Sequence, residues 1–97
     1  MTLLKNPSHP GEVLKELYLT PLGFGAIALA NELHVPRTRI ERLVKCETSV
    51  SADTAMRLAK FFGTTPEYWM NLQRAWDLAR AREITDVSDI APLVAAY

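Results

Sequence analysis

The stretch from Gly25 to Lys45 constrains the fold most, because two short helical patterns meet there across a very tight break. The first pattern has the spacing i, i+3, i+4, i+7 of a helix with one buried face, and consists of Ala26, Leu29, Ala30 and Leu33. The second follows His34-Val35-Pro36 and turns Ile40, Leu43 and Val44 inward. Helices joined by so short a turn bury both apolar faces by crossing steeply. The sequence therefore predicts a helix-turn-helix, with helices at about 25–33 and 36–45 and Pro36 in the first turn of the second.

The outward face of the second helix is rich in cations, which suits the major groove of DNA. Its residues are Arg37, Thr38, Arg39, Glu41, Arg42 and Lys45. Arg37 and Thr38 stand at the helix N-terminus, which reaches the base edges when a helix-turn-helix docks, and Arg42 follows about one turn later. An arginine can donate two hydrogen bonds to guanine, whereas Arg39 and Lys45 are equally suited to phosphate. Glu41 is expected to pair with Arg37 or Lys45.

Neighbouring positions extend this candidate interface. Gly25 and Ala26 open the first helix without a side-chain acceptor, so bare backbone N–H groups are expected to face a phosphate oxygen. Thr48 and Ser49, in the polar loop after the second helix, are expected to add contacts to the DNA backbone. His34 is expected to occupy the turn with a positive φ, which His tolerates better than most residues.

Three further helices complete the predicted fold. One spans about 11–18 and ends at Thr20-Pro21-Leu22-Gly23. Its inward positions are Val13, Leu14, Leu17 and Tyr18, and its outer face offers Glu12, Lys15, Glu16 and Leu19. Another starts after an N-cap at Ser51 and stops at Gly63, and the longest is capped by Thr65 and runs over about 66–82. The chain is therefore predicted to be all-α, a single domain over residues 1–97 that ends in a short arm.

A second copy of the chain is expected, because one short recognition helix binds DNA too weakly to select an operator. The best surface for dimerisation is the aromatic helix at 66–82 together with the apolar arm at 84–97. This arm is expected to pack either on its own domain or on a partner chain. The expected dimer contacts are Trp69, Leu72, Trp76, Ile84, Val87 and Ile90.

The charge distribution, rather than the net charge, supports a role with nucleic acid. Lys plus Arg and Asp plus Glu number 11 each in the 97 residues, so the formal net charge is zero. Residues 34–60 carry six Lys or Arg against three Asp or Glu, whereas residues 61–97 carry three against five. The middle of the chain is therefore the part suited to phosphate.

Other functional classes find little support in the sequence. The single cysteine, Cys46, allows no internal disulfide and fits a reducing compartment, and no window approaches the about 18 apolar residues of a membrane span. His9 and His34 lack a third ligand at metal-binding spacing, and no nucleophile is paired with a base. We therefore expect a cytoplasmic binding protein without metal, cofactor or catalytic residues.

From His9 to about Arg82 the sequence resembles the HigA-type antitoxins, small repressors of the lambda-repressor-like (XRE) helix-turn-helix group that neutralise a toxin encoded beside them. The resemblance rests on HPGE at 9–12, HVPRTRIERLVK at 34–45, SADTA at 51–55, LAKFFGTTPEYWMNLQ at 58–73, and Asp77-Leu78. The chain departs from the pattern at Gly25 and Ala26, where the family usually has a hydroxyl residue and Gln. It also departs at His34, where the family usually has Gly.

This resemblance implies a five-helix lambda-repressor-like domain that represses its own operon as a dimer and also binds and neutralises a HigB-like ribonuclease toxin. The residues themselves reveal no toxin site. Glu12, Lys15 and Glu16 on the first helix are candidates by elimination, since the other surfaces are assigned to DNA and to the dimer.

Two alternatives to an antitoxin stay open. A free-standing regulator of the same group would bind an operator without any toxin, and only the gene neighbourhood distinguishes it. A protein-interaction module that no longer binds DNA would also keep the fold, and it is supported by the zero net charge and by Ala26 in place of Gln. Specific retardation of DNA with a steep salt dependence would separate this module from both regulators.

Overall fold

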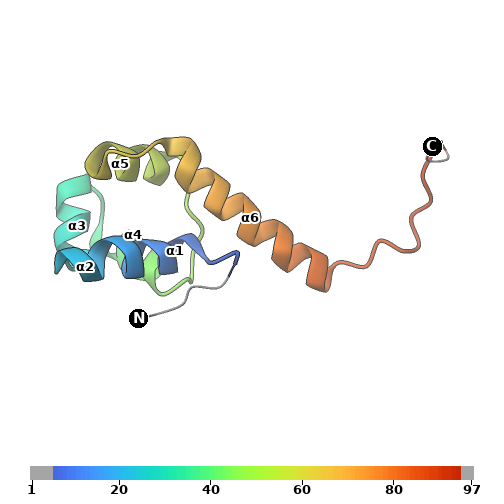
Figure 1. The fold of residues 1–97 in the computed structure, drawn as a ribbon, viewed down its shortest axis with the longest axis horizontal. Helices are drawn as coiled ribbons and strands as arrows, with labels where there is room; N and C mark the ends of the chain where they lie inside the picture. Colours follow the sequence, from blue (N-terminus) through green and yellow to red (C-terminus); the bar gives the residue numbers. More distant parts are fainter. Residues whose placement is uncertain (1–5, 95–97) are drawn as a thin grey trace.

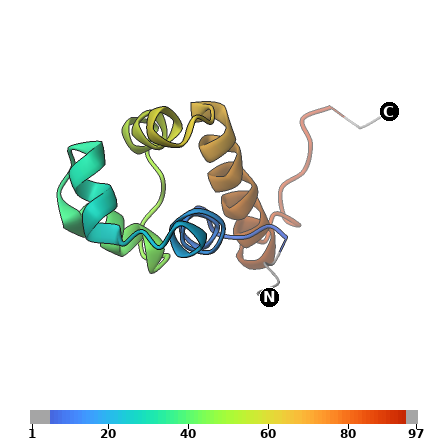
Figure 2. The same cartoon turned by 60° about the vertical axis from the view of Figure 1, so that its left-hand side comes forward.

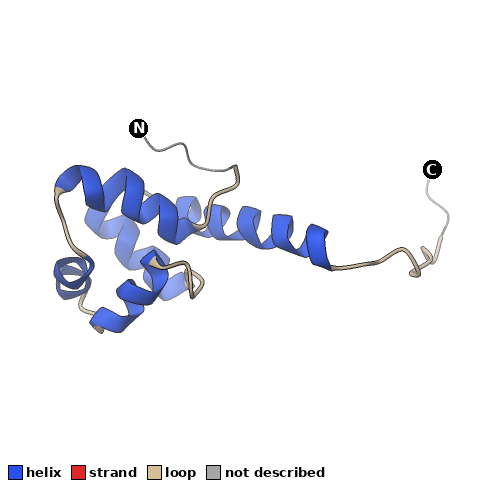
Figure 3. Cartoon of the chain, turned by 90° about the horizontal axis from the view of Figure 1, so that it is seen from below, coloured by secondary structure: helices blue, strands red, loops and turns tan. Residues whose placement is uncertain are grey.

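The computed structural model describes residues 6–94, so residues 1–5 and the last part of the expected C-terminal arm, 95–97, lie outside the described residues. Within this range the chain forms five helical stretches and no strand, which confirms the predicted all-α fold (Figure 3). The first stretch is continuous and comprises α1 (Pro10–Val13), the π-helical segment η1 (Leu14–Leu19) and α2 (Thr20–Leu22). The others are α3 (Ala26–Leu33), α4 (Arg37–Val44), α5 (Ala52–Phe62) and α6 (Pro66–Ile84).

The helices α3, α4 and α5 surround the first helical stretch, and α6 leaves this group diagonally (Figures 1 and 2). The stretch Pro10–Leu22 makes an angle of 99° with α3. α3 and α4 pack on each other, and α5 packs on α6. The C-terminal half of α6 projects beyond the other helices, so the molecule is elongated, with extents of 53 × 29 × 23 Å.

Side chains and glycine at the helix ends determine where the helices begin and stop. Ser51 accepts a hydrogen bond from the Thr54 N–H (3.2 Å), and Thr65 accepts one from the Tyr68 N–H (3.1 Å), so both predicted N-caps are confirmed. α5 ends at Gly63, whose φ of 69° lies in the left-handed region that glycine adopts without strain. α6 continues to Ile84, slightly beyond the predicted end at about residue 82.

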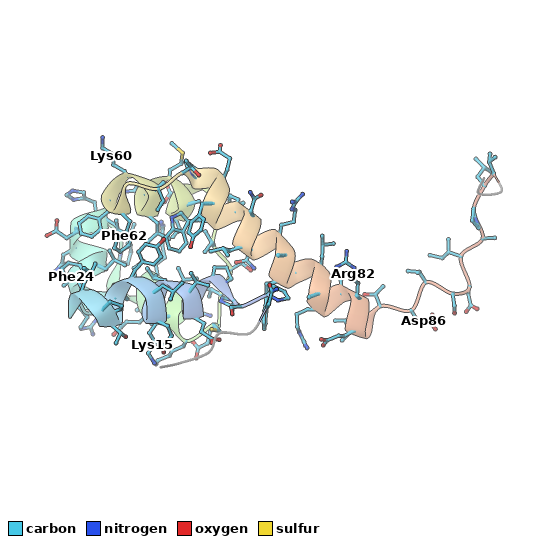
Figure 4. All side chains as sticks on the ribbon, viewed as in Figure 1. Lys15, Phe24, Lys60, Phe62, Arg82 and Asp86 are labelled. Carbon is cyan, nitrogen blue, oxygen red and sulfur yellow. The ribbon has the colours of Figure 1, made fainter. Side chains whose placement is uncertain are left out.

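The core lies where the apolar faces of the helices converge. Its buried side chains are Leu14, Leu19, Leu29, Ala30, Leu33, Ile40, Leu43, Val50, Ala55, Leu58, Ala59 and Trp69. Aromatic rings extend this cluster: the Tyr18 ring centroid lies 4.8 Å from that of Phe62 and 5.2 Å from that of Trp69. Phe62 points inward from α5, whereas Lys60 points away from the core (Figure 4). Each large apolar side chain buried here contributes about 1.5–3 kcal/mol, which makes this cluster the main source of stability.

The first helical stretch departs from the prediction in both length and register. It continues through Thr20-Pro21-Leu22, which the sequence predicted as its end, and stops at Gly23. The π-helical segment before Pro21 has wider turns, which accommodate a proline that would strain a regular α-helix. These turns also shift the buried face by one position, so Leu19 is only 4% exposed and Leu17 is 55% exposed. The predictions that Leu17 points inward and Leu19 outward are therefore wrong.

α6 contributes to the core through the residues near its N-terminus. Trp69 is fully buried, and its Nε1 donates a hydrogen bond to Oγ1 of Thr64 (2.8 Å). Because the ring is enclosed by its own chain, the prediction that Trp69 lies at a dimer surface is wrong. Leu72 and Trp76, further along the helix, are half-buried.

The described part of the C-terminal arm does not pack on its own chain. Residues 85–94 are exposed and form neither helix nor strand. Their large apolar side chains are Val87, Ile90, Leu93 and Val94, all more than half exposed. Asp86 lies beyond the end of α6, far from the other helices (Figure 4). Of the two arrangements expected for the arm, packing on the same domain is not observed in residues 85–94.

Residues 6–94 contain neither a single membrane-spanning helix nor a metal-binding cluster. No single helix in that range has the length and hydropathy of a membrane span, and only Pro10–Leu22 together with α3 reaches them, as a pair bent by 99°. No group of three His, Cys, Asp or Glu side chains in the same range is placed to hold a metal ion.

His9 caps the first helical stretch, a role that the sequence analysis did not predict. Its Nδ1 accepts a hydrogen bond from the Gly11 N–H (2.9 Å), so the proton of the neutral ring is on Nε2. The ring is buried and lies edge-on to Trp76, with a centroid distance of 5.3 Å. Burial lowers the pKa of His9, and this effect outweighs the opposing charges of Asp77 and Glu12.

Protonation of His9 is therefore expected to destabilise the protein. A histidine whose pKa is lower in the folded state contributes fully above its unfolded pKa of about 6.5, and this contribution is lost as the pH falls further. We expect the free energy of unfolding in urea to decrease between about pH 7.5 and pH 5.5. His9→Asn keeps an N-cap acceptor but does not titrate, so its decrease should be smaller. An equal decrease in both proteins would assign the pH dependence to other groups.

Gly11 allows α1 to lie directly against the C-terminal end of α4. A Cβ atom at this position would be 1.7 Å from the carbonyl oxygen of Leu43 and 2.8 Å from its carbonyl carbon. Both atoms belong to the backbone, which cannot rotate away as a side chain can. Any side chain at position 11 must therefore push α1 and α4 apart.

Gly11→Ala is expected to lower the free energy of unfolding by about 1–3 kcal/mol, the usual cost of overpacking. Gly25→Ala is the matched control, because a Cβ there meets nothing within 4 Å and the backbone φ is −91°. We expect this control to change stability by only about 0.5 kcal/mol. Urea unfolding compares the two variants, and equal effects would mean that α1 and α4 separate without cost.

Candidate nucleic-acid interface

α4 presents the predicted cationic face to solvent. Ile40 and Leu43 are 0% and 1% exposed, and their burial fixes the rotation of the helix on the core. The opposite side carries the exposed residues Arg37, Thr38, Arg39, Arg42 and Lys45. The structure thus brings these five predicted residues together on one face, where their guanidinium, ammonium and hydroxyl groups can donate to phosphates and base edges.

The turn between α3 and α4 has the predicted form, with one difference. His34 ends α3 in the left-handed region at φ 59° and ψ 45°, as expected. Pro36 has an extended backbone with ψ 141° and occupies the N-cap position, so it lies just before α4 rather than in its first turn. Neither conformation continues a helix, and the chain therefore changes direction between these two residues.

The start of α3 and the loop after α4 supply the other predicted positions. Gly25 precedes α3 with an extended backbone, and no side chain caps the helix, so its first N–H groups are available to an acceptor. Ala26 is half-buried, because its methyl group packs against the core. In the loop, Thr48 is half-buried and Ser49 is exposed.

The loop after α4 is anchored by Gln73, which the sequence analysis missed. The buried Gln73 amide accepts a hydrogen bond from the Val50 N–H (2.7 Å) and donates one to Oδ1 of Asp77 (2.9 Å). Its position in a largely apolar part of α6 was the available signal, since a buried amide needs hydrogen-bond partners. Through Val50, this contact fixes the loop that carries Thr48 and Ser49.

Two of the α4 cations are paired with carboxylates. Arg39 forms an ion pair with Asp53 in the first turn of α5, and Arg42 approaches Glu47 at 3.8 Å. All four side chains are at least 41% exposed, so the attraction is strongly screened by water. The contact between Arg39 and Asp53 joins two helices, and no sequence signal identified it.

Arg37 and Lys45 form no ion pair with any residue between 6 and 94. Glu41 lies between them on α4 but is not within ion-pair distance of either. The prediction that Glu41 pairs with Arg37 or Lys45 is therefore wrong. Each of these two cations is left available to an anionic partner.

The candidate toxin residues lie next to the C-terminal end of α4. Lys15 is exposed and points away from the helices, whereas Glu12 and Glu16 are half-buried (Figure 4). Glu12 and Lys15 both act electrostatically on Cys46, the second residue after α4. Partial burial raises the pKa of the Cys46 thiol, and the charge of Glu12 adds to this rise, whereas a hydrogen bond with the Glu12 backbone and the charge of Lys15 lower the pKa. A partner bound to this face would therefore adjoin the cationic face of α4.

The predicted dimer contacts divide into two groups. Ile84, Val87 and Ile90 are 71%, 58% and 72% exposed and lie at or beyond the end of α6. Trp76 is half-buried against His9, and Leu72 is half-buried against the core. The exposed group lies far from α3 and α4, at the opposite end of the molecule (Figure 1).

Comparison with known proteins extends over nearly the whole chain, although no family model matches it. The chain is 35% identical over 91 residues to the antitoxin HigA-1 of Vibrio cholerae, a match that covers 92% of this chain and 86% of that protein. A solved addiction module antidote protein of the HigA family from Coxiella burnetii is 43% identical, with a TM-score of 0.81 and coverage of 94% and 98% of the two chains. The antitoxin GraA, solved in complex with its operator, is 38% identical, with a TM-score of 0.86 and coverage of 98% and 99%.

These similarities are not confined to the helix-turn-helix, since they cover more than nine tenths of this chain. The departures from the family pattern at Gly25, Ala26 and His34 leave the turn and the start of α3 in their expected conformations. The chain therefore belongs to the HigA antitoxins, within the XRE-type helix-turn-helix proteins.

Proposed function

We propose that this chain is a cytoplasmic, sequence-specific repressor that inserts α4 into the major groove of an operator in its own promoter. The observation that carries the proposal is the exposed cationic face of α4, held in a fixed rotation by the burial of Ile40 and Leu43. The related antitoxin GraA has been solved with its operator, which supports the same role here. The activity proposed is binding rather than catalysis.

The position of each residue suggests its role. Arg37 and Thr38 stand at the N-terminus of α4 and are assigned to base edges, with Arg42 one turn further along the groove. Lys45, at the end of α4, is assigned to phosphate. The residues assigned to the DNA backbone on either side are Gly25, Ala26, Thr48 and Ser49. Because the cations are local, the zero net charge of the chain does not oppose this role.

Arg37→Ala and Arg42→Ala should each weaken binding to the operator by about 10- to 100-fold, the usual loss for one bidentate base contact. The duplex to use is the region directly upstream of the coding sequence, and affinity is measured by fluorescence anisotropy at several salt concentrations. Folding should be unchanged, since both side chains are exposed. Lys60→Ala is the control, because this cation points away from the core on α5 (Figure 4). Wild-type affinity in both arginine variants would mean that α4 does not read bases.

We also propose that the chain acts as a homodimer that joins two copies through the C-terminal half of α6 and the arm. Two recognition helices about 34 Å apart would then enter successive major grooves of a palindromic operator. Three exposed apolar side chains that lie close together in the sequence support this proposal: Ile84, Val87 and Ile90. A group of exposed apolar side chains is typical of a surface that a partner covers. Trp76 and Leu72 lie on the same helix and would border the interface.

Val87→Asp combined with Ile90→Asp should raise the dimer dissociation constant at least about tenfold, because burying each apolar side chain is worth about 1.5–3 kcal/mol. Sedimentation equilibrium measures the change. Leu22→Asp is the control: this residue is 65% exposed, similar to the other two, but lies at the end of α2. A double variant that dimerises like the wild type would place the interface elsewhere.

We propose, finally, that the protein neutralises a HigB-like ribonuclease toxin, as its membership of the HigA antitoxins suggests. The surface assigned to the toxin is the outer face of α1 and η1, with Glu12, Lys15 and Glu16. This face is folded in the described structure, so neutralisation would use a preformed surface. The alternative is a free-standing regulator of the same fold that has no toxin.

The test is coexpression with the product of the neighbouring gene. We expect a stable complex, and we expect the double exchange Lys15→Glu with Glu16→Lys to weaken it at least about tenfold without changing the net charge. If this variant binds the toxin with unchanged affinity, the toxin-binding surface lies elsewhere on the chain. If the wild type forms no complex but still binds its operator, the free-standing regulator is the correct alternative.

A further inference from the structure

One carboxylate of α5 connects α4, which carries the candidate DNA interface, to Arg57 of α5 and, through Arg57, to α3. Oδ2 of Asp53, in the first turn of α5, accepts hydrogen bonds from the Arg39 guanidinium of α4 and from Nε of Arg57 (2.9 Å). The same Arg57 donates through a second nitrogen to the backbone carbonyl of Leu33, the last residue of α3 (2.7 Å). A continuous chain of hydrogen bonds therefore runs from α3 through α5 to α4.

Each of these hydrogen bonds satisfies a polar group that would otherwise lack a partner. The carbonyl of Leu33 lies in the last turn of α3, where it has no partner within the helix, and Leu33 itself is buried. Arg57 supplies the missing donor. Asp53 accepts from two cations at once, and hydrogen bonds from Arg57 and then Arg39 lower the pKa of its carboxyl, so it is charged at neutral pH.

We propose that Asp53 positions α4 for DNA, in addition to the apolar contacts of Ile40 and Leu43, and that Arg39 serves to orient α4 rather than to contact DNA. This inference rests on the proposed DNA binding and revises the role that the sequence suggested for Arg39. α4 is only eight residues long, so its presentation to the groove depends on contacts outside the helix. The chain of hydrogen bonds supplies such a contact on the side that faces α5.

Whether removal of the Asp53 carboxylate raises or lowers the affinity for the operator distinguishes a positioning role from a purely electrostatic one. A carboxylate beside DNA repels phosphate, so its removal should strengthen binding to every duplex if charge alone matters. If Asp53 positions α4, its removal should weaken binding to the operator, where base contacts require alignment. Binding to unrelated DNA should still be strengthened, because Arg39 is released to reach a phosphate.

The experiment compares Asp53→Asn with the wild type on two duplexes, the operator and a scrambled sequence of the same length and composition. Affinities are measured by fluorescence anisotropy over about 50–200 mM salt. We expect the affinity for the scrambled duplex to be higher, with a salt slope steeper by about 0.9 for one added phosphate contact. We expect the affinity for the operator to fall, so that the ratio of the two affinities decreases about tenfold.

Glu47→Gln is the matched control. Glu47 is as exposed as Asp53 and also pairs with a cation of α4, Arg42 at 3.8 Å, but it does not connect α4 to α3 or α5. Its removal should raise the affinity for both duplexes and leave their ratio unchanged. If Asp53→Asn behaves in the same way, the inference is overturned.

Arg39→Gln provides an independent measurement. If Arg39 only orients α4, this variant should lose discrimination between the duplexes while its salt slope stays that of the wild type. A slope that becomes shallower by about 0.9 would make Arg39 a phosphate contact and would overturn the inference. If the wild type itself does not distinguish operator from scrambled DNA, the proposed sequence-specific binding is wrong, whatever the variants show. Circular dichroism melting of all variants checks that each one is folded.

Discussion

The close approach of α1 to α4 is the contact on which the presentation of the cationic face depends. α4 is too short to be stable alone, and its position is set by what it packs against. Ile40 and Leu43 hold it from the core side, and the backbone of α1 holds its C-terminal end where Gly11 meets the Leu43 carbonyl. A glycine at this point lets backbone touch backbone, so the position of α4 does not depend on the rotamer of a side chain between the two helices.

Buried polar groups connect this helix pair to α6. Gln73 holds the loop after α4 through the Val50 N–H, and His9 caps α1 while its ring packs on Trp76. These contacts lie in the part of α6 that faces the other helices. Beyond them α6 projects outward and ends in exposed apolar side chains. One helix thus combines a supporting half with a half available to a partner, and this division explains why Trp69 is core although it shares a helix with the proposed dimer contacts.

Charge in the interface is balanced rather than maximised. Asp53 and Glu47 both lie beside cations of α4 and reduce the local positive potential. Such carboxylates weaken the general electrostatic attraction to DNA phosphates, so they favour a ligand that offers directed hydrogen bonds over one that offers only phosphate charge. A chain with zero net charge and a small cationic face therefore suits selective binding better than strong general binding.

The sequence by itself determined the helices and the turn, because their signals are local. The hydroxyls of Ser51 and Thr65 and the glycine at position 63 act within one helical turn of their own position, and the apolar spacing on either side of His34 predicts two separate helices. Only the tertiary structure decided which side chains of these helices meet. The π-helical turns place Leu19 in the core and leave Leu17 exposed, and Arg39 forms its ion pair with Asp53, fourteen positions further along the chain. The first change depends on wider turns within one helix and the second on how two helices pack against each other, and the 3.6-residue period of a regular helix predicts neither.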